Sequence, residues 1–183
     1  MGLFNKVIKD ERKDLTPESA FQTALEASKL FPMNDLNEFN DADTFDIKAR
    51  NFTALLICSA FIYIKKVYQD NIIQPDPFND KFFGPLIRLI SENGVEKGLL
   101  NVYGMDRCLE MLERISVELI KIADSGNMSY DLAFNYYEYS GQLDFIETAY
   151  LDDKNNTFHD VEKINELHEV IKTVGKNILL KIS

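Results

Sequence analysis

The chain has 183 residues, with 20 basic and 30 acidic side chains, so its formal net charge is −10. This length fits one domain, and a hydrophobic fraction of 45% with a charged fraction of 27% is typical of a globular protein. The charge of −10 argues against broad binding to nucleic acid or anionic lipid, because a phosphate surface requires a basic counter-surface.

The pattern divides the chain into a short amphipathic N-terminal arm, residues 1–14, and a single helical domain, residues 15–183. Four apolar residues predict one face of a helix in the arm: Leu3, Phe4, Val7 and Ile8. Thr16-Pro17-Glu18 is typical of a helix start, because Thr caps free N–H groups, Pro lacks one, and Glu complements the helix dipole. This helix is expected to run to about Phe31 and to end before Pro32.

A long helix is expected from Asp43 or Thr44 to about Gln69. It is nearly all apolar from Phe52 to Ile64, as expected of a helix at the centre of a bundle. This run is shorter than the roughly 20 residues that span a bilayer. The proline-rich stretch that follows predicts a loop. A short helix is then expected from Pro85 to about Glu92, ended by Asn93-Gly94, because both residues tolerate the left-handed conformation.

Asp106 begins the best-patterned helix, which is expected to end at Gly126. Its apolar residues recur at alternating spacings of three and four: Met105, Cys108, Leu112, Ile115, Leu119 and Ile122. Ser129 is predicted to cap a helix that continues to about Leu151, and Thr157 to cap the last one. The last helix repeats the same spacing: Ile164, Leu167, Ile171, Val174 and Ile178. The sequence therefore predicts an all-α, single-domain bundle of about six or seven helices with a strongly apolar central helix.

The negative charge is concentrated in two zones. Residues 15–46 hold seven acids and one base, and residues 127–162 hold eight acids and one base. Such carboxylates could hold a divalent cation, face a basic partner protein, or imitate the phosphates of nucleic acid. The alternative is a solvated surface that confers solubility.

One turn, with the sequence ADSGNMSYD, offers oxygen ligands between two predicted helices. Asp124, Asn127 and Asp131 are the candidate ligands there for Ca²⁺, Mg²⁺ or Mn²⁺. Turn chemistry explains the same residues, because Gly126 ends one helix and Ser129 caps the next. A divalent cation is thus a possible ligand rather than a required cofactor.

Catalytic motifs are missing from the sequence: it has no nucleotide-binding glycine loop, no nucleophile elbow and no zinc-protease motif. His159 and His168 are nine residues apart on one predicted helix, so they point in opposite directions and cannot form a zinc pair unaided. Cys58 and Cys108 are expected to be buried thiols in a reducing compartment. We therefore expect a cytoplasmic protein that is not an enzyme; the enzymatic alternative is a carboxylate site in a cleft of the bundle.

Two segments resemble the TerB-like family, which is associated with tellurite resistance. MGLFNKV followed by LTPESAFQTALEAS is similar to that family's short leader and first helix, and ADSGNMSYD is similar to its acidic Asp-Gly turns between helices. In this chain Ser125 stands between Asp124 and Gly126 in that turn. The resemblance implies an all-helical, acidic stress-response protein that binds a divalent metal through Asp124, Asn127 and Asp131.

Two functions follow from these patterns. The first is a non-enzymatic acidic helical binding protein, a TerB-like stress-response accessory protein with a divalent-cation site. The second is an acidic inhibitor or immunity-type protein that binds a basic partner protein or mimics nucleic acid. Both predict a protein partner, no binding to nucleic acid and no membrane span.

Overall fold

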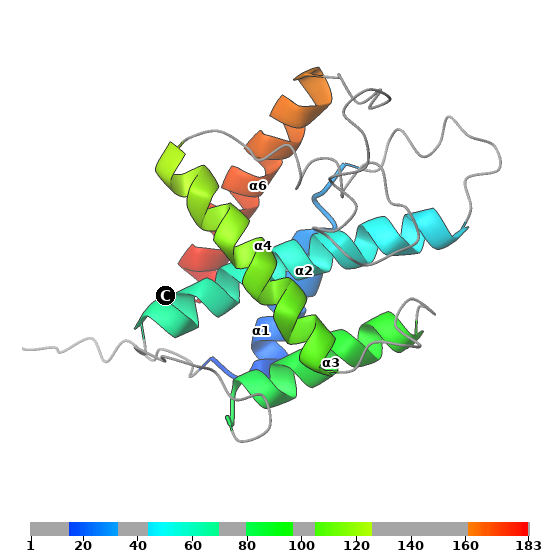
Figure 1. The fold of residues 1–183 in the computed structure, drawn as a ribbon, viewed down its shortest axis with the longest axis vertical. Coiled ribbons are helices and arrows are strands. Elements are labelled where there is room, and N and C mark those ends of the chain that lie inside the picture. The colour runs from blue at the N-terminus through cyan, green and yellow to red at the C-terminus, as the bar shows by residue number, and fades with distance from the viewer. Residues whose placement is uncertain (1–14, 33–43, 70–79, 97–104, 126–160, 183) are drawn as a thin grey trace, which may run out of the picture.

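The computed structural model describes residues 15–32, 44–69, 80–96, 105–125 and 161–182. These ranges hold five helices and no strand: α1 (Pro17–Ser28), α2 (Thr44–Gln69), α3 (Phe83–Glu96), α4 (Met105–Ser125) and α6 (Val161–Lys181) (Figure 1). The all-α prediction is confirmed for this part of the chain. The N-terminal arm, the predicted helix between Ser129 and Leu151, and the predicted cap at Thr157 lie outside the described residues.

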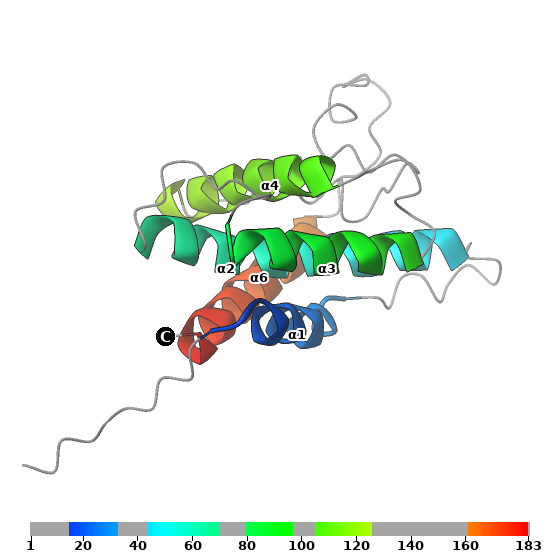
Figure 2. The same cartoon turned by 90° about the horizontal axis from the view of Figure 1, so that it is seen from below.

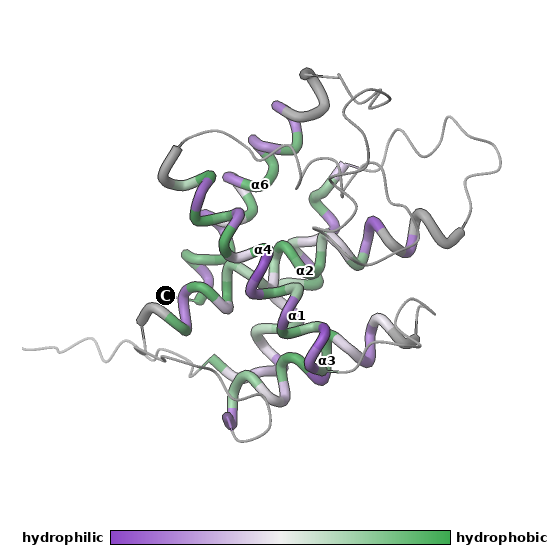
Figure 3. Tube along the Cα trace, in the orientation of Figure 1, coloured by the Kyte–Doolittle hydropathy of each residue, from purple (hydrophilic) through white to green (hydrophobic). Residues whose placement is uncertain are grey.

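α2 packs against each of the other four helices. In Figure 2, α4 lies on one side of α2, and α1 and α6 lie on the other. The nine consecutive residues from Phe52 to Ala60 are all buried, so this part of α2 contacts neighbours around its whole circumference. Figure 3 shows that α4 and α6 differ from it, because hydrophobic and hydrophilic residues alternate along both of them.

The apolar faces of α4 and α6 follow the spacing in the sequence. The buried apolar residues of α4 are Cys108, Met111, Leu112, Ile115, Leu119 and Ile122, and those of α6 are Leu167, Ile171, Val174 and Ile178. Together with the buried apolar residues of α1, α2 and α3 they form one hydrophobic cluster. The predicted seams are thus confirmed where the structure describes them.

A polar contact also links α2 to α4. The hydroxyl of Tyr63 donates a hydrogen bond to Oε1 of Glu113 at 3.1 Å. Burial raises the pKa of Tyr63 well above its ordinary value, and the nearby charge of Glu113 and this hydrogen bond raise it further. The phenol therefore stays protonated at neutral pH and remains a donor.

α1 begins as the sequence predicts and ends earlier. The Oγ1 atom of Thr16 accepts a hydrogen bond from the N–H of Ser19 at 3.2 Å, which caps the helix. The three N–H groups after Ser28 donate to carbonyls three residues back instead of four. The predicted end at Phe31 is therefore wrong by one turn. The tighter turn is consistent with Pro32, which disfavours a helical conformation at the residue before it.

α3 is longer at both ends than the sequence predicts. It begins before Pro85 because Oδ1 of Asp80 accepts hydrogen bonds from the N–H of Phe83 and of the preceding residue, both at 2.7 Å. It also continues through Asn93-Gly94 to Glu96, so the predicted stop is wrong. Gly94 is buried within the helix, so it does not end the helix in a left-handed conformation.

None of the helices in the described ranges has both the length and the apolar character needed to cross a membrane.

The capping role of Asp80 is testable by substitution. Asp80→Ala removes the acceptor for two N–H groups at the start of α3 and should lower the free energy of unfolding by about 1 kcal/mol. Asp80→Asn keeps a side-chain acceptor and should retain most of the stability. Urea denaturation followed by circular dichroism measures both variants, and equal losses would contradict a capping role.

Candidate functional site

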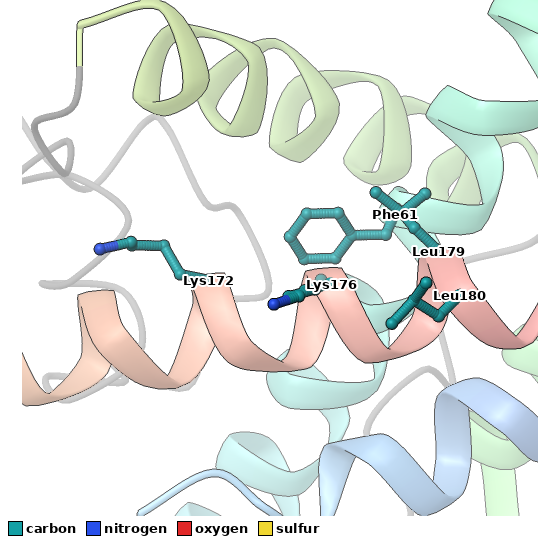
Figure 4. A pocket seen from close by; sticks show the side chains of 6 residues that line it. Phe61, Lys172, Lys176, Leu179 and Leu180 are labelled. Carbon is teal, nitrogen blue, oxygen red and sulfur yellow. The ribbon is translucent and has the colours of Figure 1, made fainter.

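An open groove lies between α2 and α6, with a volume of about 400 Å³. We call it the α2–α6 groove. Phe61 lines it from α2, and five residues line it from α6: Lys172, Gly175, Lys176, Leu179 and Leu180. Figure 4 shows the ring of Phe61 lying over α6, with the two lysines and the two leucines following one another along that helix.

Gly175 allows α6 to approach the ring of Phe61 closely. A Cβ atom at position 175 would lie 2.5 Å from Cε1 and from Cζ of that ring, which is closer than real carbon atoms approach. A side chain at this position would therefore have to displace the ring. The absence of a Cβ at Gly175 thus helps to set the shape of the groove floor.

Two leucines at the end of α6 leave apolar surface exposed beside the groove. Leu179 is 38% exposed and Leu180 is 68% exposed, whereas Ile178 before them is buried. Three consecutive apolar residues cover more than one helix face, so they cannot all turn toward the core. Among the described residues Leu30 and Val117 are also exposed, but each stands singly, Leu30 in the turn after α1 and Val117 on α4.

Lysine side chains border this apolar surface. Nζ of Lys172 lies 2.8 Å from Oε1 of Glu169, and this hydrogen bond and charge hold the pKa of Glu169 below its ordinary value. Nζ of Lys65 donates a hydrogen bond to the carbonyl oxygen of Leu179 at 3.3 Å. That carbonyl belongs to the last turn of α6, where a positive charge complements the helix dipole. The contact also ties the end of α6 to α2.

The structure describes only part of the predicted metal site. Asp124 lies in the last turn of α4, and Asn127 and Asp131 lie outside the described residues. The structure therefore does not test whether the three candidate ligands lie together. In the described ranges, no three His, Cys, Asp or Glu side chains gather closely enough to hold a metal ion.

The two cysteines are free thiols that lie in the core. Cys58 and Cys108 are both fully buried, as the sequence predicts. Burial raises the pKa of Cys108 to about 11, although a hydrogen bond with Ser91 lowers it in part. Burial raises the pKa of Cys58 more strongly than that of Cys108. Both groups are protonated at neutral pH, so neither is an activated nucleophile.

Sequence reasoning did not identify the α2–α6 groove. The available signal was the run of apolar residues at 178–180, which departs from the regular spacing of the last helix. The pairing of Phe61 with Gly175 had no such signal, because the two residues are far apart in the chain.

Comparison of the chain with protein-family models, with curated proteins and with solved structures found no match. The TerB-like resemblance therefore stays a prediction based on two short segments.

The metal-site hypothesis predicts that calcium, magnesium or manganese binds the full chain with a saturable heat. Asp124→Ala removes a charged oxygen ligand and should abolish most of that heat. Isothermal titration calorimetry measures it, with Glu18→Ala on α1 as a control that loses the same charge. Titrations without heat for all three ions would remove the hypothesis.

The close contact between Gly175 and Phe61 predicts that Gly175→Ala changes the free energy of unfolding in opposite directions with and without the ring of Phe61. Gly175→Ala should destabilise the protein by about 1 kcal/mol, because overpacking outweighs the gain in helix propensity. In a Phe61→Ala background the ring is absent, and Gly175→Ala should stabilise the protein by up to about 1 kcal/mol. Urea denaturation measures both effects, and the same sign in both backgrounds would show that the ring does not require glycine.

Proposed function

We propose that this protein is a non-enzymatic helical binding protein that contacts another protein through the α2–α6 groove. The observation that supports this function is the exposure of Leu179 and Leu180 beside an open groove whose floor is the ring of Phe61. Adjacent exposed apolar side chains gain free energy when a partner covers them, and such surface is typical of interaction sites.

The shape of the groove also favours a protein ligand. A groove between two helices is the geometry in which an amphipathic helix or an extended peptide places its apolar side chains. α2 and α6 pack against each other in the chain alone, and Lys65 of α2 adds a hydrogen bond to the carbonyl of Leu179. A preformed site loses less conformational entropy when the partner arrives.

The roles predicted from the sequence belong to this proposal as more specific hypotheses. A TerB-like stress-response protein with a divalent-cation site at Asp124, Asn127 and Asp131 would use the cation to order its surface or its partner. We also propose a cytoplasmic location and the full bundle of six or seven helices.

An acidic inhibitor or immunity-type protein is the alternative function. It is supported by the net charge of −10 and by the exposed acids Glu18 and Glu26 on α1. In that case a basic partner would bind the acidic zones, and its association would weaken steeply with salt.

Photocrosslinking in the native host tests whether a protein occupies the groove. A benzophenone amino acid at Leu180 should give a discrete adduct with one protein. The same amino acid at Val117, which is 51% exposed on α4, should not give that adduct. Mass spectrometry identifies the crosslinked protein and its contact segment. Adducts that form equally at both positions, or only within the chain itself, would contradict the proposal.

A further inference from the structure

We infer that the α2–α6 groove binds an acidic amphipathic helix of a partner protein, with apolar residues on one face and carboxylates on its flanks. This inference rests on the proposed function, that the groove binds a protein, and it names the chemistry of that protein. It also differs from the basic partner that the net charge of the chain predicts.

The charge near the groove is positive, although the net charge of the chain is negative. Residues 47–69, which form almost all of α2, include no acidic residue, and one of their four basic residues, Lys65, contacts Leu179 beside the groove. Residues 170–183, at the end of the chain, include three lysines and no acidic residue. Lys172 and Lys176 line the groove, and Lys65 contacts the carbonyl oxygen of Leu179, so a chain with a net charge of −10 presents three lysines at this place. Complementary charge on a ligand is therefore negative.

Charged and apolar groups follow one another along the groove. Lys172 and Lys176 are four residues apart, so they lie on the same side of α6. The leucines follow within one further turn, and Phe61 lies over the same stretch of helix (Figure 4). A helix laid along the groove would place apolar residues against Phe61 and the leucines. Its flanking carboxylates would then reach the ammonium groups of the lysines.

The charge of the chain favours this ligand over an anionic membrane. The rest of the chain carries enough negative charge to be repelled by anionic lipid. The glutamate that pairs with Lys172 is exposed, so a carboxylate of the ligand can replace it at low cost.

Fluorescence anisotropy of the full chain with three labelled helical peptides tests the inference. The peptides share leucines at positions i, i+3, i+4 and i+7 and carry glutamates, glutamines or lysines on the flanks. We expect the glutamate peptide to bind at least about ten-fold more tightly than the lysine peptide at low salt. Added salt should reduce this difference.

Charge variants locate the binding. Replacing Lys172 and Lys176 by Glu should weaken binding of the glutamate peptide by about ten-fold or more, and replacing both by Gln should weaken it less. The charge-matched control replaces Lys81 and Lys121, which are exposed on other parts of the surface, by Glu and should leave binding nearly unchanged. Circular dichroism establishes that each variant is folded.

Three outcomes would overturn the inference. Equal affinity for the glutamate and lysine peptides would remove the requirement for acidic charge. Equal losses in the groove variant and in the control variant would assign the effect to net charge. Binding to vesicles with one quarter phosphatidylglycerol, without binding to the peptide, would assign the groove to a membrane.

The crosslinking experiment at Leu180 separates this inference from the proposed function. A partner that crosslinks through a segment lacking carboxylates leaves the proposed function standing and contradicts the acidic helix. A crosslink between two copies of this chain would assign the groove to self-association and contradict the inference. The absence of any adduct would contradict the proposed function itself.

Discussion

The fold depends on the burial of one continuous segment of α2. From residue 52 to residue 60 no side chain is left in water, although successive side chains on a helix point in different directions. Such a segment requires neighbours on every side, and α1, α3, α4 and α6 supply them. Each of these helices has only to provide one apolar stripe. The arrangement of amphipathic helices around α2 therefore follows from the composition of α2.

This dependence explains which parts of the fold the sequence could predict. The seams of α4 and α6 were predictable because one apolar residue in every three or four marks the face that must be buried. The start of α1 was predictable because Thr16 is a local signal. The ends of α1 and α3 were not, because they depend on competing local effects. Gly94 tolerates a left-handed turn and also fits inside a buried helix, and only the packing of α3 decides between these uses.

The groove could not be predicted for a different physical reason. Periodicity identifies the side chains that a helix must bury, but it does not identify neighbours that are distant in sequence. Phe61 and Gly175 are brought together only when α2 and α6 pack. The net charge of the chain did not indicate the groove either. It is a sum over all residues, so it does not reveal a few lysines that lie together. The acidic zones that the sequence indicated lie largely outside the described residues, whereas two lysines, Lys172 and Lys176, line the groove.

The contact of Gly175 with Phe61 has a consequence for evolution. Among descendants of this chain that keep an aromatic ring at position 61, glycine is favoured at position 175, because any other residue brings a Cβ against the ring and requires the ring to move. Loss of the ring removes that constraint, and residues with higher helix propensity are then favoured at position 175. The two positions should therefore vary together between diverged relatives. This pair of positions gives a criterion for recognising relatives that keep the groove when their overall sequence identity is low.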